Sequence, residues 1–102
     1  MDNEPRMTTQ TLRVLGAILD TSGGELSGAQ IGKVAKLQSG SLYPILMRLE
    51  DAGWLSSRWE TEEPTALGRP RRRFYRLTGL GQTRARAAFQ DLLPSSGRLA
   101  WA

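Results

Sequence analysis

The stretch LYPILMRLEDAGWL, residues 42–55, carries the clearest helical pattern in the chain. Four branched apolar residues stand at i, i+3, i+4 and i+7: Leu42, Ile45, Leu46 and Leu49. This spacing predicts an amphipathic helix with one face in a core and the other face free. Because proline is tolerated in the first helical turn, Pro44 predicts a helix start between residues 39 and 41, and Gly53 predicts a left-handed end.

Two further helices are predicted upstream of this stretch. The first runs from Thr8 or Thr9 to about Asp20, where the TSGGE segment interrupts the apolar pattern. Ser27 and Gln30 form the S-x-x-Q pattern of a capping box before the second helix. Three residues are expected on the apolar face of that helix: Ile31, Val34 and Ala35. The link LQSG is so short that the second and third helices must turn sharply, as in a helix-turn-helix.

The pattern changes to alternation after Gly53, which predicts an antiparallel hairpin from residues 54–59 and 72–78. The loop ETEEPTALGRP, residues 60–70, contains two prolines and a glycine and is predicted to be irregular. Three residues are expected to face the core: Leu55, Tyr75 and Leu77. An exposed aromatic platform for single-stranded nucleic acid is the alternative. Thr78 is predicted to cap a last helix that ends at Pro94.

The composition restricts the chemistry available to the chain. A length of 102 residues is enough for one domain with a single modest core. There is no cysteine and no histidine, which removes disulfides, thiolate or imidazole metal sites and every nucleophile that needs a histidine base. The carboxylates of ETEEP lie in a polar loop with nothing nearby to raise a pKa. We therefore expect no metal, no cofactor and no enzymatic activity.

Positive charge is concentrated in the second half of the chain. The formal net charge is +4, from 14 basic and 10 acidic residues. Between residues 68 and 89 there is no acidic residue, and seven arginines occur there: Arg69, Arg71, Arg72, Arg73, Arg76, Arg84 and Arg86. A field of this sign favours a polyanionic partner. A solvated basic face that only keeps the chain soluble remains the alternative.

No segment of the sequence has the pattern of a membrane anchor. No apolar run approaches the roughly 20 residues needed to span a bilayer, and the first ten residues, MDNEPRMTTQ, lack the apolar centre of a signal peptide. We therefore expect a cytoplasmic protein without a membrane partner.

The order helix, helix, helix, strand, loop, strand, helix is that of a winged helix-turn-helix, a mainly α fold with a small β-hairpin (α+β). The run GSLYPILMRLEDAGWL, residues 40–55, followed by GRPRRRFYRLTGLG, residues 68–81, resembles the PadR family of bacterial transcription regulators. The family couples an LYP-x-L-x-RLE-x-x-G recognition helix to a basic wing ending in YRLT. The resemblance covers roughly residues 9–93. Two separate motifs in the right order make it specific.

The resemblance implies that the third helix enters the major groove of DNA with its N-terminal end. Six residues are the candidates for DNA contact: Ser39, Ser41, Tyr43, Pro44, Met47 and Arg48. Hydroxyl groups donate to phosphates or base edges, Pro44 and Met47 suit thymine methyls, and Arg48 suits guanine or phosphate. Half-buried packing is the alternative for Tyr43, and helix capping is the alternative for the two serines.

The wing is expected to contact phosphates or the minor groove through three arginines: Arg69, Arg71 and Arg72. On the opposite limb of the loop, three acidic residues are expected to face away from DNA or to pair with these arginines: Glu60, Glu62 and Glu63. Arg73 and Arg76 are the alternative strand-surface arginines. A wing of this kind positions the protein on the backbone without reading bases.

The resemblance also implies a homodimer formed through the last helix. Five residues are the candidates for that contact: Leu80, Ala85, Ala88, Phe89 and Leu92. The same small apolar stripe also suits the core of a monomer. The domain organisation expected is a frayed segment 1–7, a DNA-binding domain 8–78, a dimerisation helix 79–93 and a flexible tail 94–102. A dimer would place two half-sites by its own two-fold axis.

The function predicted is sequence-specific binding of double-stranded DNA by a homodimer that represses by occluding a promoter. A small-molecule effector fits the family, but Trp101 in the tail matches no effector motif, and Ala29 stands where the family usually has an aromatic residue. Two alternatives remain: a winged helix that binds acidic proteins, and an architectural protein that binds DNA without sequence preference. Preference for one duplex over random DNA separates all three.

Overall fold

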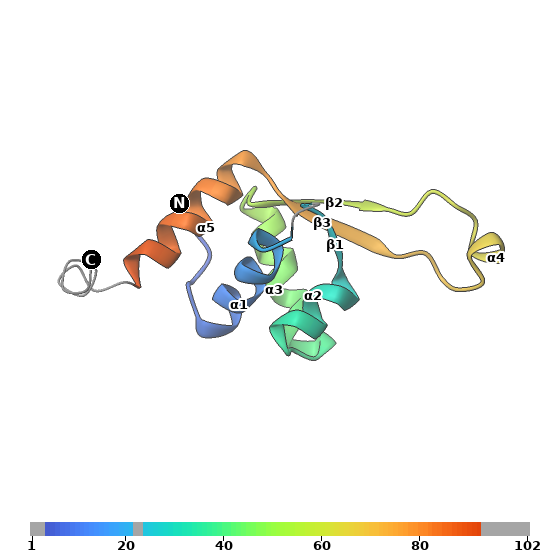
Figure 1. Cartoon of the computed structure of the whole chain (residues 1–102), viewed down its shortest axis with the longest axis horizontal. Helices are drawn as coiled ribbons and strands as arrows, with labels where there is room; N and C mark the ends of the chain where they lie inside the picture. The colour runs from blue at the N-terminus through green and yellow to red at the C-terminus, as the bar shows by residue number, and fades with distance from the viewer. Residues whose placement is uncertain (1–3, 22–23, 93–102) are drawn as a thin grey trace.

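A computed structural model describes residues 4–21 and 24–92 (Figure 1). The elements follow in this order: α1 (Thr9–Leu19), β1 (Leu26–Ser27), α2 (Gly28–Ala35), α3 (Ser39–Asp51), β2 (Leu55–Trp59), α4 (Pro64–Leu67), β3 (Arg73–Leu77) and α5 (Gly79–Asp91). This mixed α+β order confirms the predicted winged helix and adds one short strand and one short helix to it.

Side-chain caps start three of the helices where the sequence predicts them. Ser27 accepts a hydrogen bond from the Gln30 backbone N–H at 3.2 Å, and the Gln30 side chain accepts from the Ser27 N–H at 2.8 Å. This capping box opens α2. Thr8 and Thr78 cap α1 and α5 by accepting from the N–H three residues further on, at 3.1 and 3.0 Å. Local sequence therefore sets these helix starts.

Helix α3 starts within the predicted range, but the place predicted for its proline is wrong. The first helical residue is Ser39, so Pro44 is the sixth and lies in the second turn. Proline has no N–H, so the carbonyl of Gly40 loses its partner four residues on. Gly40 is exposed, so its carbonyl faces solvent. Burial of the apolar stripe of α3 outweighs the lost bond. Gly53 ends the segment with φ +82°, as predicted.

Three antiparallel strands form the sheet, in the order β1, β3, β2. The predicted hairpin is confirmed by the register of β2 and β3, in which Leu55 pairs with Leu77 and Ser57 with Tyr75. The prediction that residues 60–70 are irregular is wrong, because α4 lies inside them. Proline at the first helical position and glycine at the end favour such a helical turn. Figure 1 shows this wing extending away from the helices.

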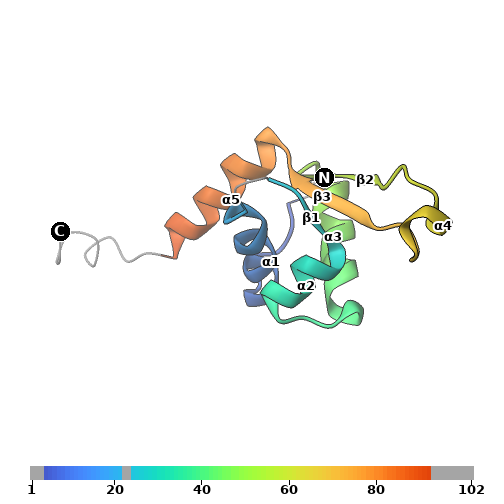
Figure 2. The ribbon, with the colours of Figure 1, turned by 45° about the vertical axis from the view of Figure 1, so that its right-hand side comes forward.

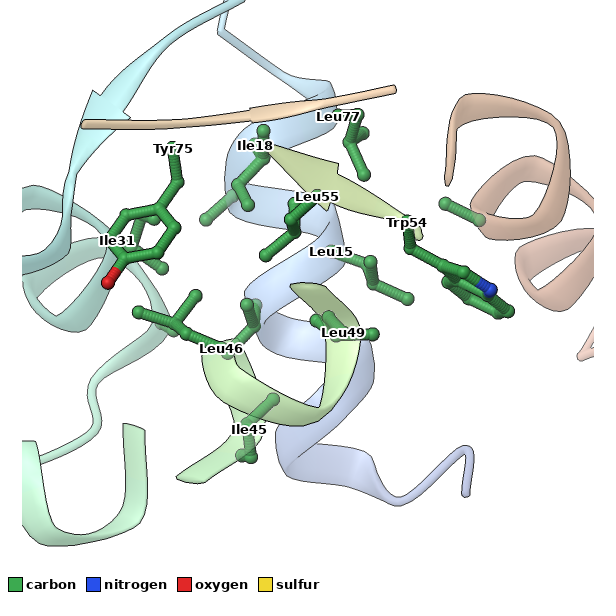
Figure 3. Packing of buried hydrophobic residues seen from close by; sticks show 14 of the residues in the cluster. Leu15, Ile18, Ile31, Ile45, Leu46, Leu49, Trp54, Leu55, Tyr75 and Leu77 are labelled. Atoms are coloured by element: carbon green, nitrogen blue, oxygen red, sulfur yellow. The ribbon is translucent and has the colours of Figure 1, made fainter. Parts of the chain in front are cut away.

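The core lies between the sheet and helices α1, α2 and α3 (Figure 3). The apolar stripe of α3 is buried as predicted, with each member at most 3% exposed. Leu55, Tyr75 and Leu77 are also buried, which confirms them as core residues. Val34 was predicted on the buried face of α2 but is 61% exposed. That helix is only 8 residues long, and its buried face is filled by Ile31 and Ala35.

Helix α5 begins against the end of α3. The Thr78 hydroxyl donates to the carbonyl of Gly53 at 2.6 Å, and the Thr78 N–H donates to the carbonyl of Trp54 at 3.0 Å. Gly81 then lies so close to the Trp54 carbonyl that a Cβ atom would collide with it. Figure 2 shows the result: α5 leaves the helical body on the side opposite the wing.

Candidate nucleic-acid interface

The outer face of α3 carries the side chains predicted to contact DNA. All six of them are exposed: Ser39, Ser41, Tyr43, Pro44, Met47 and Arg48. Met47 is 64% exposed and Tyr43 43% exposed, although both are large. The first turn of α3 contains no acidic residue. Its unpaired N–H groups and positive dipole end therefore remain available for an anion.

Arg48 lies on a different side of α3 from Tyr43. Five positions at about 100° each separate the two side chains by about 140° around the helix. Arg48 borders a hollow of about 530 Å³ that it shares with the N-terminal segment, including Glu4 and Arg6, and with Asp51 of its own helix. The mixed charge of this hollow distinguishes Arg48 from the rest of the predicted contact set.

Tyr43 packs against the start of α2 and still reaches solvent, so the packing alternative is present and the DNA contact stays a prediction. Its ring crosses the start of α2. A Cβ atom built on Gly28 would stand 2.6 Å from the Tyr43 hydroxyl oxygen and 3.0 Å from its ring. Contacts under 3.0 Å require something to move, so a side chain at Gly28 would displace Tyr43. The absence of a side chain at residue 28 therefore sets the position of Tyr43.

A network of three polar side chains connects α3 to the base of the wing. The Ser57 hydroxyl on β2 donates to Glu50 Oε2 on α3 at 2.6 Å. Arg73 on β3 donates through Nε to the Ser57 hydroxyl at 2.9 Å and lies 3.5 Å from Glu50 Oε1. The Arg73 guanidinium also lies over the rings of Trp59 and Tyr75, at 5.4 and 5.9 Å from their centres. Arg73 is thus fixed between helix and wing. The sequence signal for it was only its place in the arginine run.

Glu60 closes the wing. Its carboxylate accepts two hydrogen bonds from the Arg69 guanidinium, at 2.6 and 3.0 Å, and one from the Arg72 backbone N–H at 2.8 Å. The bonds from Arg69, followed by the one from Arg72, hold the pKa of Glu60 at about 2 instead of 4.5. This carboxylate therefore joins the two limbs of the wing while it is ionised.

The remaining wing charges are also largely paired. Arg71 donates to the Glu62 carbonyl at 2.9 Å and lies 3.1 Å from the Glu63 carboxylate. The expected pairing of wing glutamates with wing arginines is therefore confirmed for Glu60 and Glu63. Three glutamates and three arginines lie between residues 60 and 72, so this part of the wing has no net charge. Within the described ranges, the guanidinium of Arg72 forms no ion pair.

A further pair braces the short strand against the wing. Arg58 on β2 donates to both carboxylate oxygens of Glu25, at 2.9 and 2.8 Å, and lies 5.0 Å from the centre of the Phe74 ring. Arg58 lowers the pKa of Glu25 through these hydrogen bonds. Neither residue was singled out from the sequence, because 33 residues separate them.

The residues predicted for dimerisation do not share one environment. Ala85 is fully buried in the core, so its side chain is not part of an outer surface. Ala88 and Phe89 are half-buried, and Phe89 packs near Gly16 of α1. Leu80 and Leu92 are exposed, by 46% and 60%. The stripe leaves the core as α5 runs past α1 (Figure 1), which explains the change along the helix.

The described part of the chain contains neither a group of metal ligands nor a membrane-spanning helix. In residues 4–21 and 24–92, no three His, Cys, Asp or Glu side chains gather closely enough to hold a metal ion. None of the helices in these ranges has the length and apolar character that a bilayer crossing requires.

Comparison with known proteins places these elements in a family. Residues 25–87 match the model of the transcriptional regulator PadR-like family. A search of curated proteins finds no match. The structure is similar to Bacillus subtilis PadR in a complex with operator DNA, with a TM-score of 0.68 and 23% identity over 87% of this chain and 51% of that one. This chain therefore spans about half the length of the Bacillus regulator.

Two relatives are similar over most of their own length. They are smu.1704 from Streptococcus mutans UA159 (26% identity, 85% of this chain and 80% of that one, TM-score 0.63) and a PadR family regulator from Eggerthella lenta DSM 2243 (26%, 90% and 81%, 0.64). Members of this family are transcription regulators rather than enzymes. The family match covers more than half of the chain and includes both sequence motifs. The chain belongs to the PadR-like family of transcriptional regulators.

Proposed function

We propose that this regulator binds double-stranded DNA sequence-specifically, with α3 in the major groove and the wing on the backbone or in the adjacent minor groove. One observation carries the proposal: α3 buries one face completely and leaves Tyr43, Pro44 and Met47 exposed beside the wing. A helix so placed reads base edges while flanking cations hold phosphates. The similarity in fold to a regulator solved in a complex with operator DNA supports duplex DNA as the ligand.

The charge pairs of the wing rank its arginines as DNA ligands. Arg72 is the first candidate, since its guanidinium forms no ion pair in the described residues. Arg69 and Arg71 reach DNA only by exchanging Glu60 and Glu63 for phosphate. Ser39 and Ser41 extend the contact along the first turn of α3. Arg48 borders the mixed-charge hollow instead, at the edge of the contact surface.

The proposed assembly is a homodimer through the exposed side of α5, in which the exposed Leu80 and Leu92 make the main apolar contacts and the half-buried Ala88 and Phe89 lie between them. In this division residues 8–78 bind DNA and residues 79–93 dimerise. Bound across a promoter, a dimer excludes polymerase, which makes repression the simplest outcome. Sedimentation velocity tests the assembly: Leu92→Asp should convert a dimer into a monomer, whereas Gln90→Asp, also on the exposed part of α5, should not.

The test of the central proposal is fluorescence anisotropy with duplex from immediately upstream of the coding sequence, against a scrambled duplex, at several salt concentrations. A preference of about a thousandfold, with a linear dependence of log affinity on log salt, is the expected result. Equal and weak binding to both duplexes would contradict it and favour a winged helix that binds proteins. Equal but tight binding would favour an architectural protein.

A further inference from the structure

A groove of about 410 Å³ separates the recognition helix from the base of the wing. Three parts of the chain line it. The first turn of α2, residues 27–29, forms one wall, and Tyr43 of α3 lies beside it. The wing supplies the other wall through Trp59, Tyr75 and the arginines of residues 71–73. The groove therefore lies between the two elements proposed to hold DNA.

Tyr75 lines this groove, and its hydroxyl has no hydrogen-bond partner among the described residues. Tyr75 is only 5% exposed, and Figure 3 shows its ring reaching from β3 to the side of Ile31 on α2. Within the described residues the hydroxyl forms no hydrogen bond. Every fully buried side-chain oxygen and nitrogen of these residues has a hydrogen-bond partner. The unpaired Tyr75 oxygen is therefore not fully buried and remains accessible to solvent. A hydroxyl that is largely covered and has no partner within the protein is free to donate to a ligand that enters the groove.

The groove carries donors and positive charge, and no carboxylate lines its described walls. The Tyr43 hydroxyl lies over Gly28 at the start of α2, where the backbone N–H groups of a first helical turn have no acceptors within the helix. Arg73 is fixed towards Glu50, but Arg72 remains at the rim without an ion pair in this part of the chain. Two hydroxyls and a guanidinium that converge on one groove suit an anion with several acceptor oxygens.

The position of the groove identifies which anion this is, if the proposed function holds. One sugar-phosphate backbone separates the major from the minor groove of duplex DNA. With α3 in the major groove and the wing in the neighbouring minor groove, that backbone must cross between them. The crossing point is the groove between Tyr43 and the base of the wing.

We propose that this groove holds one phosphodiester of the DNA strand that passes between α3 and the wing. The hydroxyls of Tyr43 and Tyr75 donate to its oxygens, Tyr75 from the floor directly or through one water, and Arg72 neutralises its charge. Tyr75, part of the core by its ring, is thereby also a DNA-binding residue by its hydroxyl.

The decisive variant is Tyr75→Phe, which removes only the hydroxyl. Its affinity for duplex DNA should fall by roughly fivefold to tenfold, as for the loss of one hydrogen bond. Its melting temperature should stay the same or rise, because the hydroxyl has no partner in the free protein. Arg72→Ala should also lower the slope of log affinity against log salt by about one phosphate. Ser56→Ala is the matched control, since it removes an exposed hydroxyl from β2 outside the groove.

A duplex with a single uncharged methylphosphonate locates the contact. The methylphosphonate is placed at each phosphate position in turn. At one position it should weaken binding by the wild type. At that position it should weaken binding by Tyr75→Phe much less, because this variant has already lost the contact. Equal losses in both proteins at every step would overturn the proposal. Equal affinities of wild type and Tyr75→Phe for the unmodified duplex would overturn it as well.

Failure of this inference is distinguishable from failure of the proposed function. A phosphate contact does not depend on base sequence, so the comparison of wild type and Tyr75→Phe is repeated on a random duplex at low salt. If wild type shows no preference for any duplex and Tyr75→Phe is still weaker, sequence-specific regulation fails and the phosphate contact stands. If wild type binds specifically and Tyr75→Phe binds as well, only the contact is overturned.

Discussion

Helix α3 and the distal wing face the same proposed ligand but are held in place by different forces. The inward residues of α3 are at most 3% exposed and lie in the centre of the core. From Glu60 to Arg72 no residue of the wing is buried. Its conformation rests on the bonds of Glu60 and Arg71 to the opposite limb. Apolar burial is not screened by salt, whereas exposed ion pairs are.

Helix α3 is therefore held by packing, and the distal wing is held by ion pairs that respond to the ionic environment. A base-reading helix needs a fixed position, because direct readout depends on hydrogen-bond geometry. A wing that contacts the DNA backbone tolerates movement, and we expect the wing arginines of this chain to exchange glutamate for phosphate. The Glu50, Ser57 and Arg73 network lies between the two and sets where the adjustable part begins.

The largest effect should come from the rigid element. Leu46→Ala removes a side chain that is 1% exposed, so the free energy of unfolding should fall by about 2–5 kcal/mol. Leu67→Ala in the distal wing should cost less than about 1 kcal/mol, because Leu67 is half-exposed. Urea denaturation followed by tryptophan fluorescence measures both. Equal losses would remove the distinction between the packed helix and the ion-paired wing.

Arginine substitutions should separate readout from backbone contact. Arg72→Ala should weaken binding to all duplexes alike, by about tenfold, and lower the salt slope by about one. Arg48→Ala should change the ratio of specific to random affinity if Arg48 reads a base from the edge of α3. Anisotropy titrations on both duplexes measure these quantities. An unchanged ratio would show that Arg48 makes no base contact, in keeping with its place beside the mixed-charge hollow.

Disrupting the network of Glu50, Ser57 and Arg73 should reduce the free energy of unfolding by an intermediate amount. Glu50→Gln weakens the bonds to Ser57 and Arg73, and we expect a loss of about 1 kcal/mol in unfolding free energy. In a double-mutant cycle, Glu50→Gln and Ser57→Ala should be coupled by about 0.5 kcal/mol or more. Asp51→Asn is the control, because it changes the neighbouring carboxylate on the exposed side of α3. Additive losses would mean that the network does not act as one unit.

The smallest effect on stability should come from protonation of Glu60 in the wing at low pH. The folded pKa of Glu60 is about 2, below its ordinary value of 4.5. Its stabilising contribution is therefore complete above pH 4.5 and is lost as pH falls through about 2. Titration of the Glu60 carboxyl carbon by NMR checks the midpoint. In the Arg69→Ala variant the midpoint should move up towards 4.5, and an unchanged midpoint would show that Arg69 is not its main cause.

The order of the helices and the hairpin was predictable because its signals are local. Apolar spacing defines α3, and the residues that cap α1, α2 and α5 act within three positions along the chain. The same spacing placed the candidate DNA contacts of α3 on its exposed face. Val34 was assigned wrongly, because periodicity gives a helix an apolar face without showing how much of it a neighbour covers.

The sequence by itself determined the winged-helix order, the family and which face of α3 is outward. Only the tertiary structure decided that Glu60 pairs with Arg69, that Glu50 and Arg73 meet, and that Tyr75 and Tyr43 line one groove. The physical reason is the separation along the chain of the residues that interact. Helical periodicity and capping depend on residues three or four positions apart. Ion pairing and groove formation depend on side chains from separate elements, which approach one another only when the core has formed.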